Sequence, residues 1–138
     1  YKNCMTQWEL TPWQVEGVQG LAKLRDGRLG INICYDSEFP EAGRRLAESG
    51  VLLLCVPAYT ESRRGFQRVR WSCLARSVEN QIFTIHAALV GRIETAGLGT
   101  GFGSSAVIAP SIEPFPEQAV LAETPLNTGA IAIADIDF

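Results

Sequence analysis

The thiol of Cys34 is the side chain in this sequence best placed for covalent chemistry. Small and β-branched residues lead into it over residues 30–33, and a polar turn and Pro40 follow it. This order predicts a strand, a sharp turn and a helix start, with Cys34 at the turn. Open α/β sheets bind ligands at the carboxyl ends of their strands, and a nearby helix N-terminus favours the thiolate. Cys34 is therefore the candidate nucleophile, and the alternative is a small buried hydrophobic residue.

The remaining cysteines and the single histidine offer less chemistry. Cys4, Cys55 and Cys73 form no CxxC pair with each other or with Cys34, so neither a zinc ribbon nor a dithiol redox motif is supported. Cys55 and Cys73 lie in apolar patterns and are expected in the core. His86 lies inside an apolar strand pattern. A dyad of His86 with Cys34 is one option, but a core histidine with satisfied hydrogen bonds is favoured.

Two further features resemble ligand sites only superficially. The glycines of residues 94–105 lack both GxGxxG before a helix and GK[ST], so we expect a rim or interface loop there and no nucleotide site. A basic cluster is formed by Arg63, Arg64, Arg68, Arg70 and Arg76. We expect it to be a solvated helix face or an anchor for a carboxylate substrate, since acidic residues outweigh it elsewhere.

The segment GRLGINICYDSEFPE, residues 27–41, resembles the nucleophile motif of the carbon–nitrogen hydrolase (nitrilase) superfamily. Three more segments follow that family's order. Residues 1–9 resemble its lysine segment, Val56, Pro57 and Ala58 resemble the strand end after the nucleophile helix, and residues 76–81 resemble the end of the next helix. The resemblance covers nearly the whole chain.

The resemblance implies a set of catalytic roles. The family uses a glutamate, a lysine and the cysteine together, and Lys2 matches the lysine while Glu9 matches a second glutamate that helps to orient the substrate. The N–H of Tyr35 follows the nucleophile and is the expected second oxyanion donor, and Pro57 and Ala58 are expected at the substrate site. The implied reaction is hydrolysis of a small linear amide, with a nitrile as the other option, through a thioester and without metal or cofactor.

The general-base glutamate of the family has no counterpart in residues 1–138 and is expected upstream of Tyr1. The chain therefore resembles the carboxyl-terminal part of a four-layer α-β-β-α sandwich, with residues 1–138 forming a partial carbon–nitrogen hydrolase domain. An α/β fold also follows from the residue pattern. Helices are expected at 39–48 and 64–80, and strands at 28–34, 51–56, 82–89, 105–108 and 129–136, with a loop at 11–20.

Composition agrees with an enzyme core. The 138 residues are 46% hydrophobic and 20% charged, which is typical of a globular domain. The net charge of −3 argues against a nucleic-acid or membrane-surface protein, and no apolar run approaches the length of a membrane span, about 20 residues. We expect a cytoplasmic protein with reduced thiols that forms a homo-oligomer, because apolar runs such as 51–56 need cover on both faces.

Two other classes stay open at this stage. One is a catalytically inactive fragment or structural subunit of the same fold, which the absent glutamate favours. The other is a membrane-tethered or ATP-coupled relative, but the sequence shows neither spans nor an ATP motif. The soluble hydrolase is therefore the leading hypothesis.

Overall fold

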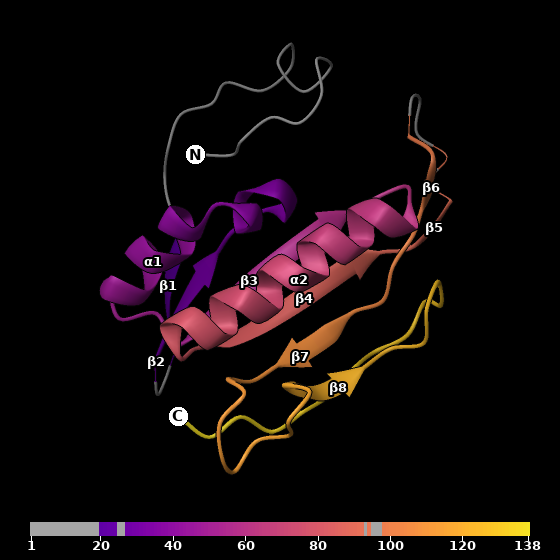
Figure 1. Cartoon of the computed structure of the whole chain (residues 1–138). Coiled ribbons are helices and arrows are strands. Elements are labelled where there is room, and N and C mark those ends of the chain that lie inside the picture. Colours follow the sequence, from indigo (N-terminus) through magenta and orange to yellow (C-terminus); the bar gives the residue numbers. More distant parts are fainter. Residues whose placement is uncertain (1–19, 25–26, 93, 95–97) are drawn as a thin grey trace.

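A computed structural model describes residues 20–24, 27–92, 94 and 98–138 of the chain (Figure 1). Two α-helices and one 3₁₀ helix accompany the strands in this part. The helical elements are η2 (Cys34–Glu38), α1 (Pro40–Glu48) and α2 (Arg63–Asn80). The strands are β1 (Gly20–Leu24), β2 (Gly27–Ile31), β3 (Leu53–Tyr59), β4 (Phe83–Leu89), β5 (Gly91–Arg92), β6 (Thr100–Gly101), β7 (Ala106–Ile108) and β8 (Val120–Glu123).

The described strands form a mixed sheet in the order β1-β2-β3-β4-β7-β8 and a separate two-stranded β5-β6 ladder. At the centre β2, β3 and β4 run parallel, and the outer pairs are antiparallel. The carboxyl ends of the three parallel strands therefore share one edge of the sheet. The β5-β6 ladder follows β4 directly and extends from this edge (Figure 1). This mixed α/β architecture is the expected fold class.

Helix α2 lies across one face of the sheet, with α1 beside it (Figure 1). Both helices begin within one residue of the predicted starts. Pro40 occupies the first turn of α1, and the Ser62 hydroxyl caps α2 by accepting from the Gly65 N–H at 3.2 Å. The core on this face joins Leu46 of α1 and Val69 of α2 to Leu54 of β3. Adjacent strand residues point to opposite faces, so Leu53 belongs to a second cluster on the far face.

The carboxyl-terminal strand predicted at 129–136 is wrong. Residues 124–138 form no ladder, whereas Val120–Glu123, which was not predicted, is strand β8 and pairs with β7. Ile131 and Ile133 are 87% and 83% exposed, while Ile136 packs against the far-face cluster. Alternating residues define an extended segment with two different faces, but a strand also needs a hydrogen-bonded neighbour, and alternation does not encode one.

The far face of the sheet carries exposed apolar side chains near its carboxyl edge. Ile31 and Leu89 are 40% and 48% exposed, and Ile33, just past the end of β2, is 41% exposed. An apolar face of this kind is normally covered by another layer or another chain. It is the physical basis for the expected homo-oligomer, which stays a prediction. No helix in the described part of the chain is long and apolar enough to cross a membrane.

Candidate active site

Cys34 lies at a sharp turn beyond the end of β2. The strand ends at Ile31, three residues earlier than the predicted boundary, and Cys34 opens η2 with a φ of 51°. The α-helix starts only at Pro40, so the short η2 turn separates Cys34 from its N-terminus. The Asp36 carboxylate supports this turn by accepting a hydrogen bond from the Ile33 N–H at 3.2 Å. The structure thus has the predicted turn, with a 3₁₀ segment that the sequence pattern did not reveal.

The thiol faces the carboxyl end of the neighbouring strand. Cys34 is 8% exposed, and its Sγ lies 3.6 Å from the main-chain oxygen of Tyr59, the last residue of β3. The register agrees, because Ile31 pairs with Cys55 and the chain past Ile31 continues alongside the end of β3. The nucleophile candidate therefore lies at the edge where parallel sheets bind ligands.

Pro57 and Ala58 lie near the carboxyl end of β3. Ala58 is buried in the same cluster as Cys34, whereas Pro57 is exposed. The pairing of β2 with β3 ends at Cys55, so Pro57 pairs only with β4, and a residue without an N–H is tolerated there. The structure thus brings Ala58 into the neighbourhood of Cys34, and the substrate-binding role of both residues stays a prediction.

Tyr35 follows the candidate nucleophile, and its ring is held between two side chains. Phe39 packs edge-on against it with ring centroids 5.0 Å apart, and the Arg68 guanidinium carbon lies 5.8 Å from the ring centroid. Arg68 in turn forms an ion pair with Glu38 in the same turn. Helix α2 therefore contacts both ends of the segment that carries Cys34 and Tyr35.

Lys2 and Glu9, the other predicted catalytic residues, lie outside the described residues, as does Cys4. Their roles stay predictions. In the described part no group of three or more histidine, cysteine, aspartate or glutamate side chains is arranged to hold a metal ion.

The other described cysteines are poor nucleophiles. Burial raises the pKa of the Cys73 thiol to about 12, and burial also raises the pKa of Cys55. Cys73 lies on the buried face of α2 and is fully buried, whereas Cys55 of β3 is half-buried. The core prediction is confirmed for Cys73, whereas Cys55 is only partly buried and belongs to neither core cluster.

His86 is the core histidine that the sequence favoured. It is 1% exposed, its ring stacks on Phe66 at 5.8 Å, and its Nδ1 accepts a hydrogen bond from Arg70 Nε at 3.1 Å. Arg70 also pairs with Glu123 at 2.9 Å and donates to the Ser104 main-chain oxygen at 2.8 Å. Burial, with a further contribution from the Arg70 charge, lowers the pKa of His86 to about 3. The imidazole is therefore neutral at physiological pH.

The expectation of a solvated arginine face is wrong for part of the basic cluster. Arg70 and Arg76 are 7% and 5% exposed, and Arg68 pairs with Glu38, whereas Arg63 and Arg64 face solvent. The buried guanidinium groups bind main-chain and side-chain acceptors on neighbouring elements, which compensates for their burial. Sequence spacing alone does not show which arginines on a helix find such acceptors.

The low pKa of His86 predicts acid sensitivity of the fold. The unfolded chain binds a proton near pH 6.5 and the folded protein only near pH 3, so the free energy of unfolding falls as pH drops below about 6.5. At pH 5 the protonation of His86 in the unfolded chain is expected to lower the free energy of unfolding by about 2 kcal/mol. Urea unfolding at pH 7.5 and pH 5 measures the loss, and His86→Gln should lack this part of it. Equal pH dependence in both proteins would contradict the assignment.

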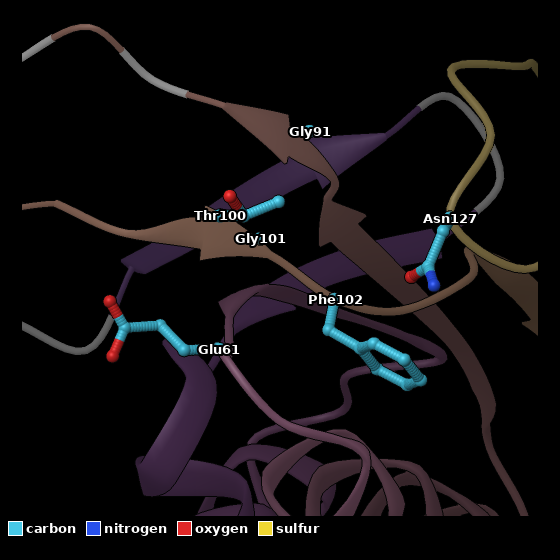
Figure 2. Close-up of a pocket in the computed structure, with 6 residues that line it drawn as sticks. All are labelled: Glu61, Gly91, Thr100, Gly101, Phe102 and Asn127. Atoms are coloured by element: carbon cyan, nitrogen blue, oxygen red, sulfur yellow. The ribbon is translucent and has the colours of Figure 1, made fainter.

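A pocket of about 250 Å³ lies at the same edge of the sheet (Figure 2). It is lined by Glu61, Gly91, Thr100, Gly101, Phe102 and Asn127, with Glu61 and Asn127 on opposite sides of the segment that carries Thr100 and Phe102. The Glu61 carboxylate accepts hydrogen bonds from the Tyr59 hydroxyl at 2.8 Å and from the Gly99 N–H at 2.9 Å. Tyr59 thus connects the two features, because its carbonyl faces Cys34 and its side chain holds the pocket rim.

Cys34 thus lies on a tight turn at the carboxyl edge of the three parallel strands. Residues 5–138 match the family model of the carbon–nitrogen hydrolases, and the chain belongs to that family. It is 38% identical to the probable hydrolase YhcX of Bacillus subtilis, over 80% of this chain and 22% of that protein. It is 34% identical to the deaminated glutathione amidase of Dictyostelium discoideum, over 80% of this chain and 35% of that protein.

Solved structures agree with this membership. The chain resembles the NitN amidase of Nesterenkonia sp. AN1, of the nitrilase superfamily, with a TM-score of 0.66 and 26% identity over 88% of this chain and 44% of that one. A glutamate variant of that amidase shows covalent addition of the acetamide moiety of fluoroacetamide at its active-site cysteine. The present chain thus spans 22% to 44% of the length of these proteins.

Proposed function

We propose that this chain carries the nucleophile and an oxyanion donor of a thiol amidohydrolase that cleaves small linear amides. The observation that supports this most is the placement of Cys34, a buried cysteine with a left-handed backbone at the carboxyl edge of the parallel strands. Non-glycine residues in that conformation are uncommon and cluster at active sites. Amides are preferred over nitriles because the dictyostelid relative and the Nesterenkonia protein are both named amidases.

In the proposed reaction the Cys34 thiolate attacks the amide carbonyl carbon. The Tyr35 N–H and the Lys2 ammonium stabilise the charge that develops on the carbonyl oxygen. The glutamate expected upstream of Tyr1 takes the thiol proton and passes it to the leaving nitrogen, so that ammonia or an amine leaves and the acyl group remains on sulfur as a thioester. Water activated by the same glutamate then releases the carboxylic acid and restores the thiol. Each step uses only protein side chains, main-chain N–H groups and water.

Selective labelling with a chloroacetamide tests whether the site is organised for this chemistry. We expect mass spectrometry to find Cys34 labelled well before Cys55 and Cys73, because burial raises the pKa of both of those thiols. The unfolded chain is the control, since all described cysteines should then react at similar rates. Labelling of Cys34 no faster than Cys55 in the folded protein would contradict the proposal and favour a structural subunit.

A further inference from the structure

The hydroxyl group of Ser37 binds the peptide unit that carries the proposed oxyanion donor. The carbonyl group of Cys34 and the N–H of Tyr35 belong to one planar peptide unit and point in opposite directions. Ser37 Oγ donates a hydrogen bond to the Cys34 main-chain oxygen at 2.7 Å, and the Ser37 side chain is fully buried. By holding one end of the peptide unit, this bond fixes where the Tyr35 N–H points.

The turn needs such support because its backbone is costly. Cys34 has a φ of 51°. For a non-glycine residue, the left-handed region costs roughly 1–2 kcal/mol of conformational free energy relative to the ordinary helical region. A strained residue of this kind persists only where the surrounding structure over-determines it. The 3₁₀ turn itself supplies little stabilisation, since it spans only five residues.

Ser37 is itself held by helix α2. Arg76 Nη1 donates to the Ser37 main-chain oxygen at 3.1 Å, and Nη2 donates to Glu79 Oε1 at 3.1 Å. The guanidinium reaches the turn because residue 43 is glycine: a Cβ there would lie 2.7 Å from Arg76 Cδ. A chain of hydrogen bonds therefore runs from α2 through Ser37 to the peptide between Cys34 and Tyr35.

We infer that Ser37 is a positioning residue for the oxyanion donor, with Arg76 as its support from α2. The inference rests on the proposed function, because it assumes that Cys34 attacks a carbonyl carbon. Without the Ser37 hydroxyl, the Cys34–Tyr35 peptide can tilt, and the N–H no longer points at the developing oxyanion. The thiol keeps its own place at the end of β3, so its reactivity toward reagents that need no oxyanion donor is retained.

Two reactions of the same thiol separate these effects. Amide hydrolysis needs the oxyanion donor, whereas alkylation by iodoacetamide displaces iodide at a saturated carbon and needs none. In a protein extended upstream to the length of its relatives, Ser37→Ala should lower kcat for amides by about 10- to 100-fold with little change in KM. The alkylation rate of Cys34 and its pH profile should stay within about twofold of the unmodified protein.

Ser77→Ala is the matched control. Ser77 is as buried as Ser37, and its hydroxyl also donates to a main-chain oxygen, that of Ile82, at 2.6 Å. It lies near the end of α2, and its hydroxyl binds the segment that leads into β4 and not the turn that carries Cys34. Both variants lose one buried hydrogen bond, and only Ser37→Ala should lose kcat. Ser37→Thr, which keeps a hydroxyl, should retain kcat within a few-fold and carries the test should Ser37→Ala not fold.

Three results for the Ser37 variants would overturn the inference: unchanged kcat in Ser37→Ala, an equal fall of hydrolysis and alkylation in that variant, or a folded Ser37→Thr as slow in hydrolysis as the alanine variant. A comparable loss in Ser77→Ala would also overturn it, because the effect would then be general destabilisation. A different result would contradict the proposed function itself: amide hydrolysis by the Cys34→Ala variant, independent of the outcome for the Ser37 variants.

Discussion

Replacing Cys34 by alanine is expected to abolish amide hydrolysis in the protein extended upstream, with a loss of at least about 10⁴-fold in kcat. The thiol is the only protein group in the proposed reaction that forms a bond to the acyl carbon, so no neighbouring residue replaces it. Cys34 is buried in the helix-side core, and the loss of its sulfur should cost about 1 kcal/mol of stability. The fold should therefore survive the change.

Cys55→Ala is the matched control for this experiment. It removes a thiol of the same size from the neighbouring strand β3, where the side chain is half-buried and its pKa is raised by burial. Ammonia release should continue at nearly the original rate in this variant, and circular dichroism should show both proteins folded. More than a trace of turnover in folded Cys34→Ala would remove Cys34 from the mechanism.

The second large effect concerns the general base. Residues 1–138 alone are expected to turn over amides about 10²–10⁴-fold more slowly than the protein extended upstream, because deacylation needs a group that activates water. The described part of the chain offers no evident substitute. Glu38 pairs with Arg68, the Glu61 carboxylate accepts from the Tyr59 hydroxyl, and His86 is neutral and bonded to Arg70.

Ammonia release from a panel of short amides, measured for both chain lengths, provides the test. Equal rates would place the base within residues 1–138, with Glu9 the first residue to replace and His86 the second. No ammonia release from either chain, together with normal folding, would favour a structural subunit over an enzyme. If only the extended chain releases ammonia, this activity should disappear when its upstream glutamate is replaced by glutamine.

Much of the local structure could be predicted from the sequence, because it depends on neighbouring residues. The helix that starts at Pro40, the long helix α2 and the buried strand before Tyr59 follow from proline placement, apolar spacing and a continuous apolar run. The motif around Cys34 also identified the family, since that stretch of residues is specific. Hydrogen bonding along a helix and side-chain alternation along a strand are local effects, so local patterns predict them.

The pairing of strands and the contacts of the site could not be predicted in this way. Residues 129–136 alternate like a strand yet find no neighbour, and the less regular Val120–Glu123 pairs with β7. Likewise, five arginines look alike in the sequence, but only Arg76 reaches the carbonyl of Ser37 and only Arg70 reaches His86. These outcomes depend on which acceptors, distant in the chain, the packing of α2 on the sheet brings within hydrogen-bond distance. Local patterns therefore identify the family, the candidate nucleophile, both described α-helices and four of the eight described strands, whereas the support of the turn that carries Cys34 depends on contacts between residues distant in the chain.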